Sequence, residues 1–282
     1  MTTKKRILLG SPIRQKPAIL HEFLESLKRL EKSSYDLDYF FVDDNDDPAS
    51  SELLKKFYTH FEGHVLISPA NRQHARSFLC TEITHFWDYE LIRRVASFKD
   101  SMIERTLKEK YDYLFLIDSD LLLHPKTIER LLETKKEIVA TIFWTQWNEL
   151  LSARPQVRLL GQYAQHELEQ YRQYEHELHE DLSKEELKKR RDQVCFDILK
   201  KPGTYEVGFL GACTLISNQA LQKGLSFKLV KNLELWGEDN HFCVRATILG
   251  CSLFVDTHYP AYHIYRDSNL AAASEFIEKT RN

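Results

Sequence analysis

The chain has 282 residues, of which 43% are hydrophobic and 29% charged, and its formal net charge is −3. This composition is typical of a globular protein with room for one large α/β domain or two small ones, and the small net charge gives no reason to expect a nucleic-acid partner. No apolar run approaches the ~20 residues of a membrane-spanning helix, and the run after the basic N-terminus is too short for a signal peptide. Five cysteines without C-x-x-C spacing predict reduced thiols and no zinc site. We therefore expect a cytoplasmic protein, either soluble or attached peripherally to a membrane.

Strands and helices are predicted to alternate through the first half of the chain. Short apolar runs predict strands at 7–10, 39–42, 64–67, 113–117 and 137–143. Segments with helical spacing lie between them, at 17–31, 50–60, 90–110 and 126–133. This alternation predicts a parallel sheet with helices on both faces. Right-handed crossovers would place the carboxyl ends of these strands along one edge, where the loops that follow them form a cleft.

Two carboxylates follow the central apolar run directly. Residues 113–117 are almost entirely apolar, as in a strand buried on both faces, and Asp118 and Asp120 come next. Neighbouring carboxylates repel each other and lose solvation, so a divalent cation with oxygen ligands suits the space between them. Ligands of open α/β sheets also bind beyond the carboxyl ends of strands. The motif predicts a metal site, and the alternative is that the two aspartates only end the strand and form the next turn.

The second half of the chain contains a polar segment between two globular ones. Residues 162–201 are rich in Glu, Lys, Arg, His, Gln and Tyr, which predicts an exposed, charged helical insertion. It is either a solvent-exposed segment without a chemical role or a lid that docks a partner or selects the acceptor. A glycine-punctuated apolar run follows at 207–216, and Ser217 is expected to cap a short helix. The pair Glu238-Asp239 then opens a helical pattern, where the helix dipole favours negative charge.

Three features now stand in order along the sequence: Asp118-Ser-Asp120 after a buried strand, Trp236-Gly-Glu-Asp239 at a helix start, and Asp256 to His263 after a last strand at 252–255. This order resembles the GT-A fold glycosyltransferases, particularly family 2 and its relatives. The resemblance extends from Lys5 to about Arg266, with the 162–201 insertion outside it. It implies a Rossmann-like, mainly parallel sheet flanked by helices in one catalytic domain. The nucleotide-sugar half would cover about 1–145 and the acceptor half about 146–282.

The resemblance implies a divalent metal, Mn²⁺ or Mg²⁺, and a nucleotide site. Asp118 and Asp120 would ligate the metal with His263, while His258 is a competing ligand. The nucleotide would be held after the first and second strands, by cationic side chains of the 70–100 region and by the Asp-Ser-Asp motif: Ser11, Pro12, Asp43, Asp44, Arg72, Arg76, Arg94, Lys99, Asp118 and Ser119. The irregular stretch 69–87 departs from the simpler family pattern and looks like an insertion.

The catalytic and acceptor residues are implied in the same way. Asp239 resembles the base of inverting family members, which takes the proton of the acceptor hydroxyl, and Glu238 would hold the acceptor or the helix start. Trp236 is placed to stack on a sugar ring, and Trp144 and Trp147 are further acceptor-side candidates. The expected reaction is transfer of a sugar from a UDP- or GDP-sugar to an acceptor hydroxyl. The alternative for the acidic pair is helix capping, and for the tryptophans it is core packing.

The motifs also permit other classes of protein. A retaining GT-A transferase would keep the Asp-x-Asp motif without using the acidic pair as a base. A phosphatase-type hydrolase also has an Asp-x-Asp motif, but normally on its first strand, and here the motif is followed by Leu121. A sugar-nucleotide pyrophosphorylase needs a Gly-rich basic loop, which residues 10–14 do not provide. A non-catalytic nucleotide-sugar-binding protein is the last alternative.

Overall fold

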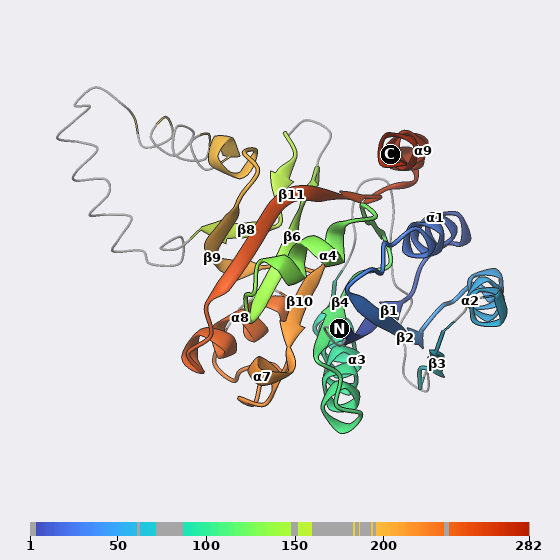
Figure 1. The fold of residues 1–282 in the computed structure, drawn as a ribbon, viewed down its shortest axis with the longest axis horizontal. Helices are drawn as coiled ribbons and strands as arrows, with labels where there is room; N and C mark the ends of the chain where they lie inside the picture. Colours follow the sequence, from blue (N-terminus) through green and yellow to red (C-terminus); the bar gives the residue numbers. More distant parts are fainter. Residues whose placement is uncertain are drawn as a thin grey trace.

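The structure is a computed structural model that describes residues 4–60, 63–71, 87–147, 152–159, 183, 186, 193, 196–233 and 237–281. The strands of these residues are β1 (Lys5–Ile13), β2 (Tyr35–Asp43), β3 (Val65–Pro69), β4 (Tyr113–Leu116), β5 (Leu121–Leu122), β6 (Ile138–Thr145), β7 (Arg154–Pro155), β8 (Val157–Leu159), β9 (Thr204–Leu210), β10 (Thr214–Ser217) and β11 (Leu253–His263). Nine of them form one continuous path in the order β3-β2-β1-β4-β10-β6-β11-β9-β8 (Figure 1).

Pairing in the sheet is mixed. Strands β3, β2, β1 and β4 are parallel to one another, and β6 is parallel to β11. Strand β10 runs antiparallel between β4 and β6, and β9 pairs antiparallel with β11 and β8. The α/β class and the mainly parallel sheet flanked by helices are therefore confirmed. Strands from both predicted halves of the chain share this sheet, and the boundary near residue 145 stays a prediction.

Helices cover both faces of the sheet. They are α1 (Pro17–Lys28), α2 (Pro48–His60), α3 (Tyr89–Lys108), α4 (Thr127–Glu133), α7 (Asn218–Leu221), α8 (Glu238–Ile248) and α9 (Leu270–Lys279), with a 3₁₀ turn, η1 (Asp267–Asn269). One hydrophobic core lies under α1, α2, α4 and α9, and the other lies under α3, α7 and α8. Figure 1 shows α3, α7 and α8 together on one side of the sheet, away from α1, α2 and α9.

The central strand contributes side chains to both cores. Phe115 and Ile117 pack into the first core, and Leu114 and Leu116 pack into the second. Each is almost fully buried, which stabilises the fold by about 1.5–3 kcal/mol per side chain. The apolar run of the sequence is thus a strand buried on both faces, as predicted, and it fixes where Asp118 emerges.

Three boundaries differ from the sequence prediction. Strand β1 does not end at Gly10 but continues to Ile13; Gly10 lies close under α3, where a Cβ would come within 2.6 Å of Met102 Sδ. Strand β11 continues past residue 255 because its end pairs with β5. Helix α4 begins at Thr127, one residue after the predicted start at 126. Ser217 does cap α7, accepting a hydrogen bond from the Ala220 N–H as predicted.

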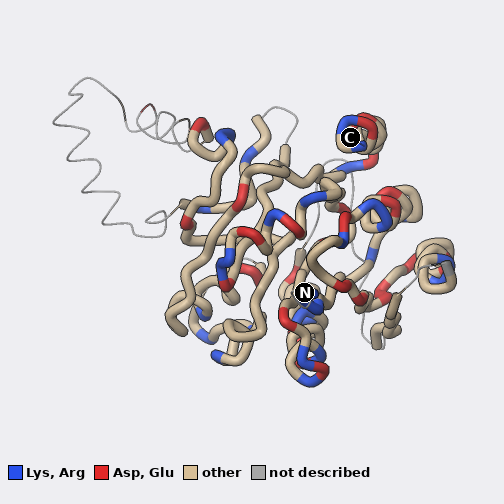
Figure 2. The backbone as a smooth tube through the Cα atoms, in the orientation of Figure 1, with Lys and Arg blue, Asp and Glu red and all other residues tan. Residues whose placement is uncertain are grey.

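Most of the 162–201 insertion lies outside the described residues, so its helical and partner-docking character stays a prediction. The same holds for Arg72, Arg76 and Trp236. Lys and Arg are interspersed with Asp and Glu over α1 and α3 (Figure 2), as the small net charge suggests. Among the described helices, none combines the length and apolar character that a membrane span requires.

Candidate active site

The turn after β4 brings an aspartate and a histidine together. Strand β5 follows the Asp118–Asp120 turn and pairs with the end of β11, so that Leu121 faces His263. The Ile264 N–H donates a hydrogen bond to the Asp120 carbonyl oxygen at 2.8 Å, which fixes this register. As a result His263 Nε2 lies 3.5 Å from Asp120 Oδ2. Two segments about 140 residues apart therefore meet at the edge of the sheet.

The imidazole of His263 is oriented by a buried threonine that the sequence analysis did not single out. Thr145, at the end of β6, places its Oγ1 2.8 Å from His263 Nδ1. Gln156 Nε2 donates to the same hydroxyl at 3.1 Å. When His263 Nδ1–H donates to Thr145, the Nε2 lone pair faces Asp120, which is the orientation that a metal ligand needs. The predicted strand ends at residue 143, so no signal in the sequence marked Thr145.

The donor set at this turn suits a divalent metal. Carboxylate oxygens and a neutral imidazole are ligands that Mn²⁺ accepts, and Mg²⁺ is often held by one or two carboxylates with substrate phosphates. Within the described part of the chain, no three His, Cys, Asp or Glu side chains already form a closed metal cluster. The pair Asp120 and His263, with Asp118 beside them, would thus hold a metal together with ligands from a bound diphosphate and water.

A buried lysine joins this turn to the start of α8. Gly237 adopts a positive φ of 87° at the N-cap, a conformation that favours glycine, and α8 begins at Glu238. Lys99 Nζ, from α3, lies 2.7 Å from Glu238 Oε1 and 2.9 Å from Asp239 Oδ1. It also lies 3.8 Å from Asp118 Oδ1. The two acidic motifs of the sequence therefore meet around one ammonium group.

Burial and mutual repulsion change the acidity of this cluster. Burial, with the neighbouring Glu238 and Asp118 carboxylates, raises the pKa of Asp239 to about 7 against the opposing effect of Lys99. Loss of solvation beside this cluster likewise raises the pKa of Asp118, with Lys99 again opposing and Asp120 adding to the rise. Burial alone would lower the pKa of Lys99, but the three carboxylates outweigh it and raise that pKa. Asp239 thus has the acidity expected of a base that works near neutral pH.

A pocket extends from the Asp118–Asp120 turn along α3. Its lining residues are Pro12, Ile13, Arg14, Gln15, Asp44, Trp87, Leu91, Val95, Phe98, Asp118, Ser119, Asp120 and Glu238. One wall of the pocket is apolar and consists of Leu91, Val95 and Phe98 of α3. Their helical spacing is visible in the sequence, but it did not by itself assign them to a ligand site. The pocket is thus apolar along one side and carboxylate-rich at one end, which suits a ligand with a flat ring and a phosphate–metal group.

The structure separates the two acids after β2. Asp44 lines the pocket and accepts a hydrogen bond from Arg94 Nε at 2.9 Å. Asp43 instead accepts from Asn45 Nδ2 at 2.8 Å and Ser51 Oγ at 3.0 Å, so it holds the turn together. Of the residues expected after the second strand, Asp44 is the one placed to contact a ligand.

The other expected nucleotide contacts lie in different places. Pro12 and Ser119 line the pocket. Ser11 is fully buried inside β1 and is not among the lining residues, because the strand continues past Gly10. Arg94 reaches the pocket through Asp44, while Lys99 points into the acidic cluster. The binding roles of all these residues remain predictions.

Comparison with solved structures identifies the fold. The mannosyltransferase PcManGT from Pyrobaculum calidifontis, in complex with GDP-Man and Mn²⁺, superposes with a TM-score of 0.54 at 9% sequence identity. The chain has the fold of a GT-A glycosyltransferase. S. aureus TarS 1-349 superposes with a TM-score of 0.50 at 12% identity. No family model matches the sequence, and no curated protein does.

The two superpositions cover nearly all of this chain. The alignment spans 99% of this chain with PcManGT and 98% with TarS 1-349, but only 62% and 64% of those chains. At such low identities the likeness establishes the GT-A fold and no more. Activity and ligands have to be argued from the site itself.

Trp144 and Trp147, which were expected near the acceptor, are not among the residues that line the pocket. Trp144, on β6, packs edge-on against Phe196 with ring centroids 5.8 Å apart. Trp147 is 44% exposed, two residues beyond the end of β6. Core packing therefore accounts for Trp144, whereas Trp147 is open to a ligand. An acceptor role for either side chain stays a prediction.

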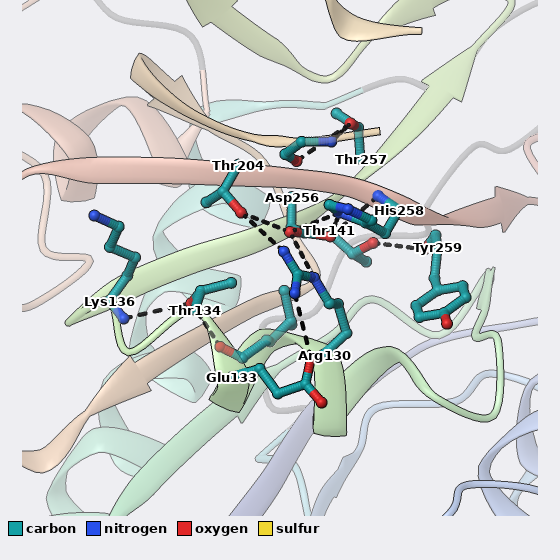
Figure 3. Close-up of polar contacts among 12 residues, drawn as sticks. Arg130, Glu133, Thr134, Lys136, Thr141, Thr204, Asp256, Thr257, His258 and Tyr259 are labelled. Atoms are coloured by element: carbon teal, nitrogen blue, oxygen red, sulfur yellow. Dashed lines mark hydrogen bonds and ion pairs between the residues drawn. The ribbon is translucent and has the colours of Figure 1, made fainter. Parts of the chain in front are cut away.

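The competing histidine is engaged in a separate polar cluster. His258 Nδ1 lies 3.0 Å from Asp256 Oδ1, and Arg130 Nε donates to Asp256 Oδ2 at 3.1 Å (Figure 3). Thr204 Oγ1 donates to the same Oδ2 at 2.8 Å. This cluster ties α4, β9 and β11 together. Asp256 and His258 thus stabilise the sheet, and His263 is the histidine that lies beside the Asp118–Asp120 turn.

Replacing Asp256 by alanine should destabilise the protein without altering the candidate site. The carboxylate is 1% exposed, and its loss would leave Arg130 and Thr204 without this shared partner. We expect the free energy of unfolding to fall by about 3 kcal/mol, toward the lower end for a broken buried ion pair because Arg130 is partly exposed. Urea unfolding measures it, with Asp36→Ala, an exposed β2 aspartate, as control. A loss below about 1 kcal/mol would contradict the structural role of Asp256.

Proposed function

We propose that this chain is a metal-dependent glycosyltransferase that moves a sugar from a nucleoside-diphosphate sugar to an acceptor hydroxyl with inversion at the anomeric carbon. One observation carries the proposal: the pocket ends between two acidic motifs that meet around Lys99. The Asp118–Asp120 turn with His263 suits a metal and a diphosphate, and Glu238-Asp239 offers a base on the adjoining side. A site that only bound nucleotides would not need this second acidic pair.

The pocket supports a nucleoside diphosphate as the donor's leaving group. Its apolar wall from α3 suits the face of a base, and Asp44 suits the polar edge of the base or the ribose. Asp120, His263 and Asp118 would hold Mn²⁺ or Mg²⁺, which when bound supplies Lewis-acid stabilisation of the departing diphosphate. PcManGT, which shares the fold, was solved with GDP-Man and Mn²⁺, and this supports the same class of donor here. UDP- and GDP-sugars are both candidates.

Transfer would proceed by in-line displacement. The acceptor oxygen forms a bond to the anomeric carbon while the bond from that carbon to the diphosphate oxygen breaks, and its electron pair leaves with the diphosphate. Asp239 takes the proton of the acceptor hydroxyl, and Lys99 keeps that carboxylate in place before the reaction. Glu238, which lines the pocket, orients the acceptor side.

Transfer can be tested by NMR of the anomeric protons. UDP- and GDP-sugars would each be incubated with Mn²⁺, the protein and a panel of sugar acceptors. The proposal expects loss of one donor signal, growth of its nucleoside diphosphate and a product of opposite anomeric configuration. Retention of configuration would contradict the role of Asp239 as a base. No turnover of any donor, together with no nucleotide binding, would contradict the transferase assignment.

The rate of transfer should rise with pH through about 7. Asp239 accepts a proton only as a carboxylate, and its pKa is raised to about 7 by burial and by Glu238 and Asp118, with Lys99 opposing. Below that pH the group is increasingly protonated, so the rate should fall about tenfold per pH unit. A pH profile of kcat measures this, with nucleotide affinity followed in parallel. A flat profile between pH 5.5 and 8 would contradict the assignment.

A further inference from the structure

Lys99 is a buried cation held among three carboxylates. Its side chain is 2% exposed and is not among the residues that line the pocket. Its Nζ lies 5.2 Å from the centre of the Phe227 ring, so one side of the ammonium is covered by an aromatic face. The carboxylates of Glu238, Asp239 and Asp118 surround the rest of it. A phosphate in the pocket would therefore compete with three carboxylates for this ammonium.

The three acids do not hold the lysine equally. Glu238 and Asp239 accept hydrogen bonds at 2.7 and 2.9 Å, whereas Asp118 lies at 3.8 Å, an ion pair without a hydrogen bond. Asp118 is also the most exposed of the three, at 44%, and it borders the pocket. Three acids therefore share this one cation. Asp118 is therefore the acid that can turn toward a second cation.

We propose that Lys99 is a positioning residue that links the base to the metal site. Its ammonium group is the counter-ion of Asp118 when no metal is bound, and it repels a divalent cation that binds at Asp118. This inference rests on the proposed function. Lys99 would hold Asp239 in place through its hydrogen bond, while its charge weakens cation binding at the adjoining turn. Removal of that charge should therefore have opposite effects on the two sites: tighter binding of a divalent cation, and slower transfer.

The inference can be tested by titration of Mn²⁺ without nucleotide. Free Mn²⁺ would be followed by electron paramagnetic resonance at pH 8 for wild type and Lys99→Met. We expect the variant to bind Mn²⁺ about tenfold more tightly, because a like charge near the cation has been removed. Its kcat for transfer should fall by about 100-fold, the scale of a misplaced general base. A merely structural lysine would weaken both properties.

Two further variants separate the possible failures. Lys99→Gln keeps donor N–H groups for the acids without the charge, and it replaces Lys99→Met if circular dichroism finds that protein unfolded. Lys223→Met is the matched control, because Lys223 pairs with Glu137 away from the cluster. Mn²⁺ affinity that is unchanged or weaker in a folded Lys99 variant would overturn the inference alone. A wild type that binds neither Mn²⁺ nor nucleotide would overturn the proposed function as well.

Discussion

Asp239→Asn is expected to lower the rate of sugar transfer by about 10²- to 10⁴-fold, the usual contribution of a general base. The amide cannot take the proton of the acceptor hydroxyl, whatever the pH. Its oxygen can still accept the hydrogen bond that Lys99 donates to Asp239 at 2.9 Å, so the start of α8 should keep its place. The loss should therefore fall on kcat, while the affinity for nucleotide stays near that of wild type. Steady-state kinetics with the donor identified by NMR measures both quantities.

Glu238→Gln provides the comparison for this variant. Glu238 lies next along the chain, contacts the same lysine and lines the pocket, so it shares the environment but not the proposed role of Asp239. We expect a smaller loss of kcat and a larger change in KM for this variant. If Glu238→Gln abolishes turnover while Asp239→Asn retains most of it, the base has been assigned to the wrong acid.

Asp120→Ala is expected to weaken metal-dependent binding of nucleoside diphosphate by about 100-fold, at the upper end for disruption of a metal environment. The variant leaves His263 facing the turn without its carboxylate partner at 3.5 Å. Nucleotide binding in EDTA, which depends on the pocket walls and Asp44, should change little. Calorimetric titration of the nucleoside diphosphate with Mn²⁺ and with EDTA separates the two contributions.

The control for Asp120→Ala is Asp36→Ala, which removes an exposed carboxylate on β2 far along the chain from the turn. It should bind nucleotide as wild type does. Equal affinities of Asp120→Ala and wild type in Mn²⁺ would mean that the metal, if one binds, is held elsewhere. In that case Asp120 and His263 would have only the structural role of joining β5 to β11.

The central strand and the two acidic motifs could be predicted because their signals are local. An apolar run of five residues, followed directly by Asp118, predicts a buried strand and its carboxyl end, and the structure has β4 there. Acids at 238 and 239 in front of a helical pattern favour a helix start, and α8 begins at Glu238. Right-handed crossovers between the parallel strands β2, β1 and β4 then bring the loops after β2 and β4 to one edge of the sheet.

The sequence could not predict features that depend on distant partners. The extension of β11 to His263 requires β5, and the antiparallel place of β10 depends on β4 and β6 on either side. The sequence analysis predicted a nucleotide contact for Lys99 from its charge. Its position beside Glu238 at the start of α8 arises only in the folded chain. The choice between Asp43 and Asp44 likewise depends on Arg94, 50 residues away.

The most direct test of the metal–diphosphate site is the melting temperature of the wild-type protein with nucleoside diphosphates. The protein would be heated with UDP, GDP, CDP or ADP, each with Mn²⁺ and with EDTA. At about 100 times its Kd, the right nucleotide should stabilise the fold by roughly 2.7 kcal/mol and raise Tm by about 5 °C or more. We predict this rise for UDP or GDP in Mn²⁺ and little of it in EDTA. No rise with any nucleotide under either condition would contradict the proposed donor site.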